Sequence, residues 1–143
     1  MKRPDWTSRL YEFVYDPTNA VFVWGKNDCI MFGANCVRHI TDEDPLSTVL
    51  DVWTTRDEAQ QVLEQMGGMY EAVCSVLGPP IENPAMYQRG DLVLVELPIG
   101  DMLMVHLGDR LVGPTEESGL ISVKVGHSKC VWAIGRHYAS GDS

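Results

Sequence analysis

Hydrophobic and polar residues follow two different periods along the chain, and the change comes near Pro84. Before Pro84, apolar residues recur every three to four positions, which is typical of amphipathic helices with one buried face. We expect helices over residues 6–14, 29–39, 56–66 and 69–77. After Pro84, short aliphatic runs bounded by glycine, proline and aspartate are typical of strands. We expect strands over residues 92–95, 102–107, 111–112, 120–125 and 131–134.

Local signals define several boundaries between these elements. Thr55 followed by Glu58 forms a capping box at the start of the third helix. The dipeptide Gly108-Asp109 predicts a two-residue hairpin turn, and the apolar run 20–24 is expected to form a short strand. Helices in the first half and an antiparallel meander sheet in the second predict an α+β domain, with the N-terminal helices packed on the C-terminal sheet.

Length and composition narrow the class of protein. A chain of 143 residues predicts one domain over 1–143, with a core over about 6–138 and a flexible tail over 139–143. Hydrophobic residues make up 45% and charged residues 22%, which excludes a disordered or fibrous chain. No apolar run reaches the roughly 20 residues of a membrane span, and no signal-peptide core follows the N-terminus. We therefore expect that the protein is made in the cytoplasm and does not insert into a membrane.

The net charge excludes further partners. Acidic residues outnumber basic ones 20 to 11, so the formal charge is −9. Nucleic-acid binding depends on neutralising phosphates with Lys and Arg, so we expect no nucleic-acid partner. An anionic membrane or an anionic cell-wall polymer would likewise repel this surface.

Cysteine usage leaves one candidate for chemistry. No CxxC pair exists, so the sequence predicts no metal site, no disulfide framework and no cofactor; the four cysteines are at positions 29, 36, 74 and 130. Cys29 falls in the first turn of the second helix, with Asn27 or Asp28 as N-cap. The helix dipole and free backbone N–H groups there favour a thiolate, the nucleophilic form. The alternative for every cysteine is a small, packed hydrophobic side chain.

Two motifs carry a family resemblance. The segment 22–29, Phe-Val-Trp-Gly-Lys-Asn-Asp-Cys, resembles the nucleophile region of NlpC-type cysteine peptidases, papain-like enzymes that cut peptidoglycan stem peptides. The segment 89–92, Arg-Gly-Asp-Leu, resembles the strand that follows the helical half in that family. The chain resembles more closely a group of small, uncharacterised NlpC-like proteins of phage and prophage tail modules. Further shared features are Gly67-Gly68, Gly119-Leu120 and Trp132-Ala133, so the resemblance spans about residues 6–135 and implies a papain-like fold.

The resemblance also implies site residues. Cys29 would be the nucleophile, and the general base would be a histidine at the position that Met102 occupies when the motif is aligned on Gly108. His106 is the base candidate that remains. It lies on the same strand face as Met102 but four residues farther along, roughly 13 Å at about 3.3 Å per residue. Residues expected to support the site or bind substrate are Trp24, Asp28, Met102 and Trp132.

Three functional hypotheses follow. The first is a tailed-phage tail-tip or tail-assembly component with an NlpC-like fold and weak or lost peptidase activity, a pseudoenzyme that contacts other tail-tip proteins. The second is an active murein endopeptidase or amidase that uses Cys29 on peptidoglycan peptides during genome delivery. The third is an unrelated soluble α+β domain. The first two place the protein in the virion tail after synthesis in the host cytoplasm.

Overall fold

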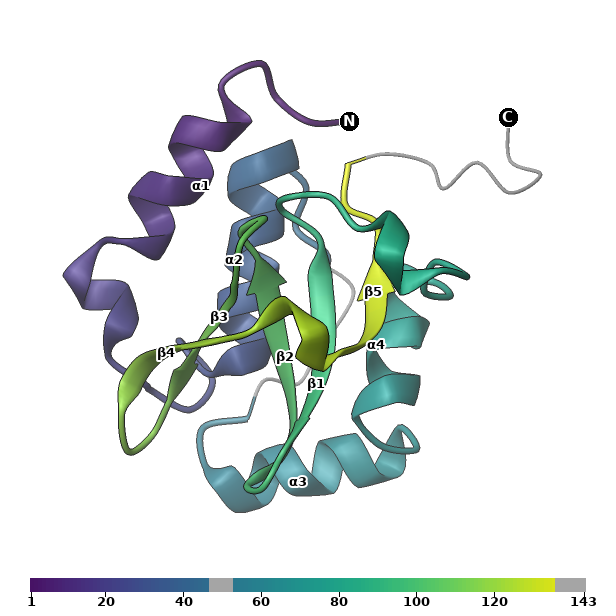
Figure 1. The fold of residues 1–143 in the computed structure, drawn as a ribbon. Coiled ribbons are helices and arrows are strands. Elements are labelled where there is room, and N and C mark those ends of the chain that lie inside the picture. The colour runs from purple at the N-terminus through teal and green to yellow at the C-terminus, as the bar shows by residue number, and fades with distance from the viewer. Residues whose placement is uncertain (47–52, 136–143) are drawn as a thin grey trace.

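A computed structural model describes residues 1–46 and 53–135, in which helices come first and strands second (Figure 1). The helices are α1 (Trp6–Val14), α2 (Cys29–Thr41), α3 (Arg56–Gln65) and α4 (Met69–Leu77). The strands are β1 (Leu92–Leu97), β2 (Gly100–His106), β3 (Leu111–Thr115), β4 (Gly119–Val123) and β5 (Ser128–Trp132). This confirms the predicted α+β class. The predicted tail, 139–143, and the end of the predicted core, 136–138, lie outside the described residues.

Local capping chemistry sets the start of α3. Thr55 Oγ1 accepts the backbone N–H of Glu58 at 3.2 Å, and Glu58 Oε1 accepts the backbone N–H of Thr54 at 3.1 Å. The predicted capping box is confirmed, except that Thr54 rather than Thr55 supplies the returning backbone donor. Gly67, with a φ of +94°, follows the end of the helix, because glycine adopts this conformation without steric cost.

The sheet has the strand order β4-β3-β2-β1-β5, and the strand pairs are antiparallel. Strands β1 to β4 form the predicted meander, and β5 pairs with the other side of β1. The turn between β2 and β3 is the predicted Gly108-Asp109 hairpin, closed by a hydrogen bond from Leu107 N–H to Arg110 C=O at 2.8 Å. In Figure 1, the connection from β4 to β5 through η3 (Val125–His127) crosses the sheet on the face opposite α2.

Apolar side chains fill the space on both faces of the sheet. Alternate residues of a strand point to opposite faces, so β1 and β2 contribute to two clusters. The cluster under the helices includes Leu92, Leu94, Leu103 and Val105. The cluster on the other face includes Val93, Val95, Met102 and Met104. Burial on both faces explains why β1 begins with four consecutive aliphatic residues rather than an alternating pattern.

The expectation of a strand over 20–24 is wrong. The chain forms a 3-10 turn, η1 (Pro17–Ala20), and Val23 makes only an isolated bridge with Asn27. The reason is a side chain that the pattern does not reveal. The Asn27 amide donates to the backbone carbonyls of Asn19, at 2.6 Å, and Val21, at 2.9 Å, and so holds this segment folded back on itself.

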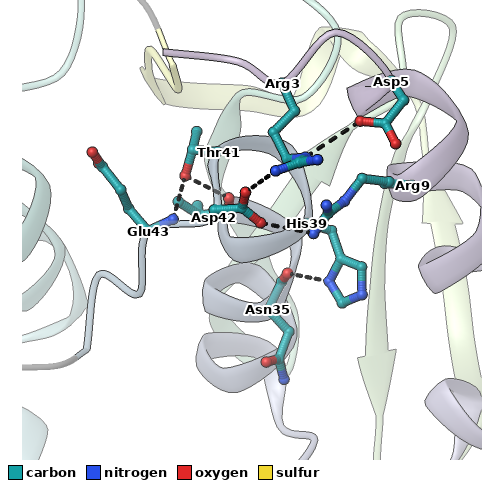
Figure 2. Close-up of polar contacts among 9 residues, drawn as sticks. Arg3, Asp5, Arg9, Asn35, His39, Thr41, Asp42 and Glu43 are labelled. Carbon is teal, nitrogen blue, oxygen red and sulfur yellow. Dashed lines mark hydrogen bonds and ion pairs between the residues drawn. The ribbon is translucent and has the colours of Figure 1, made fainter.

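Ion pairs hold the start of the chain against the end of α2 (Figure 2). The Asp42 carboxylate accepts hydrogen bonds from Arg3 and, at 3.0 Å, from Arg9 of α1. The Arg3 backbone N–H also donates to the Ile40 carbonyl at 2.8 Å. The Arg3 guanidinium lowers the pKa of Asp42 below its ordinary value. Together these contacts place α1 beside α2, with which it shares the first apolar cluster.

Candidate functional site

A cleft of about 510 Å³ is lined by residues of α3 and of two turns of the sheet. Its walls come from the segment before α2, the first turn of α2, α3, the β1–β2 turn and the β3–β4 turn. Four of the predicted site residues line it: Trp24, Asp28, Cys29 and Met102. The predicted residues His106 and Trp132 do not line this cleft.

Asp28 is a buried carboxylate that organises the cleft floor. Its Oδ1 accepts the Met31 N–H at 2.9 Å, which makes it the N-cap of α2. Its Oδ2 accepts the Gly25 N–H at 2.9 Å and the indole Nε1–H of Trp53 at 2.5 Å. Sequence reasoning missed Trp53, because it lies 25 positions from Asp28 and no local pattern links the two residues. Asp28 thus joins three chain segments at the start of the Cys29 helix.

Cys29 is the first residue of α2 and packs against both apolar clusters. Burial raises the pKa of its thiol to about 12. Hydrogen bonds from the Leu103 backbone N–H and from the N–H groups of Cys29 and Ile30 oppose this rise, whereas the negative charge of Asp28 adds to it. Desolvation therefore outweighs the helix N-terminus, and the thiol is protonated at neutral pH.

Met102 lies in the cleft wall with Cys29 and precedes Leu103, the residue whose N–H faces the sulfur. Gly113 of the neighbouring strand faces the end of its side chain. A Cβ at Gly113 would lie 2.8 Å from Met102 Cε, so the flexible end of the Met102 side chain would have to shift. The position that the resemblance gives to the general base is thus filled by a thioether, which binds protons far too weakly to act as a base.

His106 lies away from Cys29, at the far end of β2. It is three residues beyond Leu103, roughly 10 Å at about 3.3 Å per residue. Its buried ring stacks on Tyr87, with centroids 4.0 Å apart, and its Nδ1 accepts the Gly108 N–H at 2.9 Å. The proton is therefore on Nε2, which has no hydrogen-bond partner among the described residues. The structure gives His106 a role in holding the β2–β3 turn and does not bring it to Cys29.

The stability of the fold is expected to fall as the pH drops from 7.5 to 5, in part because of His106. Burial lowers the pKa of His106 below 6.5, although the charges of Asp91 and Asp109 oppose this shift. The unfolded chain therefore binds a proton near pH 6.5 more readily than the folded protein does, so acid favours unfolding. Urea unfolding midpoints at the two pH values measure the loss. His106→Gln keeps an acceptor for Gly108 and should show a smaller loss; an equal loss would refute this assignment.

Trp132 is a core residue rather than part of the cleft. It is buried under the helical layer, and its indole Nε1–H donates to the Gly78 carbonyl at 3.0 Å. Tyr70 of α4 packs on it with ring centroids 6.0 Å apart. The register pairs Trp132 with Leu92 of β1. Through this hydrogen bond and this ring contact, its large side chain holds β5 against α4 and the residue that follows it.

The Arg-Gly-Asp-Leu segment has a structural role here. Asp91 is fully buried and accepts the N–H groups of Gln88, at 2.8 Å, and Ile134, at 3.1 Å. Gly90 has a φ of +93° and donates its N–H to the His106 carbonyl at 2.7 Å. A side chain at Gly90 would also approach Ile40 and Trp6 within 3.2 Å. The motif therefore joins the start of β1 to Ile134, two residues after the end of β5.

The described part of the chain offers little for metal chemistry. No group of three His, Cys, Asp or Glu side chains within 1–46 and 53–135 is placed to hold a metal ion. All four cysteines are free thiols. Over the same residues, no helix is long and apolar enough to cross a membrane.

Comparison with known proteins identifies a family for this chain. No curated protein matches the chain. A family model described as a domain of unknown function, DUF6950, matches residues 1–134, which includes every described helix and strand and the whole cleft. The chain belongs to the DUF6950 family.

Proposed function

We propose that this protein is a tail-tip or tail-assembly component of a tailed phage, built on an NlpC-like domain whose peptidase activity is lost. The observation that supports the loss is the presence of Met102 beside Cys29 in the cleft. The tail assignment rests on the order and spacing of the motifs shared with NlpC-like proteins of phage tail modules.

Acid–base chemistry supports the loss of activity. A general base must come within about 3 Å of the proton that it removes, directly or through one water. His106 is instead held by Tyr87 and Gly108 at the other end of β2. With a pKa of about 12, the Cys29 thiol is protonated in nearly all molecules at pH 7. Neither the nucleophile nor its base is prepared for peptide cleavage.

The net charge supports a protein that partner proteins bring to the cell wall, rather than an enzyme that binds the wall by itself. The formal charge of −9 disfavours a lasting association with an anionic cell-wall polymer. A protein that meets such a wall then depends on partners for its position, and a tail tip provides them.

The experiment that tests the proposal has two parts. The purified protein and a Cys29→Ala variant are incubated with muropeptides, and stem-peptide release is followed by mass spectrometry beside an active NlpC-type peptidase. We expect no cleavage by either form, and Cys29-dependent release would contradict the proposal. Mass spectrometry of purified phage particles should also detect the chain in the tail fraction; its absence from tails would contradict the tail assignment.

An active cysteine peptidase is the second candidate. One observation favours it: Cys29 begins α2, and three backbone N–H groups, from Leu103, Cys29 and Ile30, are directed at its sulfur. Such donors stabilise a thiolate, the nucleophilic form that a cysteine peptidase requires. In this case the muropeptide assay gives cleavage that Cys29→Ala abolishes.

A further inference from the structure

We propose that the cleft binds a basic peptide segment of a partner protein, which inserts an apolar side chain between the cleft walls and sets a lysine or arginine against Glu116 and Glu117. The inference rests on the proposed function, because it names the chemistry of the tail partner at that same cleft.

The cleft walls are apolar and partly open to solvent. Phe22 and Trp24 pack edge to face, with centroids 4.7 Å apart, and both line the cleft while remaining partly exposed. On another wall, Ile99 at the β1–β2 turn is 74% exposed. Ile121 of β4 also lines the space. A concave surface with exposed aromatic and aliphatic side chains is typical of a binding site, because burial of these groups stabilises a complex.

The charges around the cleft are unequal. Glu116 and Glu117 are adjacent, exposed residues of the turn between β3 and β4, and neither forms an ion pair with any described residue. Asp101 adds a third carboxylate, while Arg56 at the start of α3 contributes one guanidinium. Two neighbouring unpaired carboxylates make the local electrostatic potential more negative. The edge of the cleft formed by Glu116 and Glu117, here called the Glu116–Glu117 lip, therefore attracts a cation.

The buried carboxylate of the cleft does not compete for that cation. Both oxygens of Asp28 already accept N–H groups, from Met31, Gly25 and Trp53. The carboxylates left to contact a cation directly are those of Asp101, Glu116 and Glu117, which line the same cleft as the apolar walls. A segment that combines one bulky apolar residue with neighbouring lysines or arginines satisfies both features, and a cleft of about 510 Å³ accommodates such side chains.

Fluorescence anisotropy with defined peptides tests the inference on the intact chain. The probe is an acetylated, amidated and fluorescein-labelled peptide of sequence Gly-Leu-Phe-Lys-Lys-Gly, and the matched probe has two glutamates in place of the lysines. We expect the lysine peptide to bind at least tenfold more tightly than the glutamate peptide. We also expect its binding to weaken when the ionic strength rises from 0.05 M to 0.3 M, because salt screens exposed charges.

Matched variants locate the binding. Glu116→Gln combined with Glu117→Gln removes two charges from the lip and should weaken binding of the lysine peptide by about tenfold. Glu12→Gln combined with Glu43→Gln removes the same charge from exposed positions outside the cleft and should leave affinity within about twofold. Ile99→Ser, at a residue too exposed to support the fold, should also weaken binding. Circular dichroism of each variant verifies folding.

Several outcomes would overturn the inference: equal affinity for the two peptides, equal effects of the two double variants, or no binding of the lysine peptide below 1 mM. Preferential binding of an unlabelled stem peptide in competition would also overturn it and identify the cleft as a muropeptide site. Repeating the anisotropy with the Cys29→Ala variant measures peptide binding in a chain that lacks the candidate nucleophile. Binding and cleavage are thus tested separately. Cleavage of muropeptides by the unmodified chain refutes the loss of activity, whereas the anisotropy alone decides the preference for basic peptides.

Discussion

Cys29 is expected to react with iodoacetamide at pH 7 roughly 30- to 60-fold more slowly than a cysteine in an unstructured peptide. Its pKa is raised from 9.0 to about 12, which leaves about a thousandfold less thiolate. The more basic thiolate is more nucleophilic, with a Brønsted coefficient of about 0.4–0.5, so roughly 15- to 30-fold of the rate is recovered. Mass spectrometry of the peptide that contains Cys29, sampled over time, measures the rate.

Two controls make this result specific. In concentrated urea the same cysteine should react as fast as the peptide standard, since unfolding removes the burial that raises its pKa. In the native fold, Met102→His places an imidazole in the cleft wall beside Cys29 and should accelerate alkylation. A native Cys29 that reacts as fast as the standard would show that the thiol is activated and would favour the peptidase hypothesis.

Replacing Asp28 with alanine should destabilise the fold by about 3 kcal/mol or more. Loss of an N-cap costs about 1 kcal/mol, and each buried donor left without a partner costs about 1–3 kcal/mol. The donors here are the part-buried Gly25 N–H and the buried Trp53 indole N–H. Urea unfolding followed by circular dichroism gives the difference in the free energy of unfolding.

Graded variants separate capping from burial. Asp28→Asn keeps one acceptor oxygen for Met31 and should lose less stability than Asp28→Ala. Asp16 caps η1 by accepting the Thr18 N–H but is exposed, so Asp16→Ala should have a much smaller effect. If Asp28→Ala and Asp16→Ala had similar effects, the buried hydrogen bonds of Asp28 would not contribute as described.

The sequence predicted features that depend on neighbours in the chain. The periods of apolar residues predicted the four α-helices and the regions of the five strands that the structure describes, although β5 spans Ser128–Trp132 rather than the expected 131–134. The Thr55–Glu58 capping box and the Gly108-Asp109 hairpin appear as expected. The failed strand over 20–24 depends instead on where the Asn27 amide folds back, which local pattern does not encode.

The candidate site was predictable only in part, for the same reason. The motif placed Cys29 at a helix start and Trp24, Asp28 and Met102 around it, and the cleft contains all four. The helix dipole suggested a thiolate, but burial of the sulfur outweighs it and raises the pKa of Cys29. Similarly, sequence spacing could not show that Trp132 packs on α4 or that Trp53 reaches Asp28.

The position of β1 has a consequence for how the chain folds during synthesis. β1 lies between β2 and β5, and the buried Asp91 at its start accepts a hydrogen bond from Ile134. As the polypeptide leaves the ribosome, β1 and β2 can pair early. The other edge of β1 stays open until β5 emerges, and β5 begins at Ser128, whereas β1 ends at Leu97. An open edge with four consecutive aliphatic residues invites pairing with other nascent chains. Efficient production of this protein therefore depends on how quickly translation delivers β5 after β1.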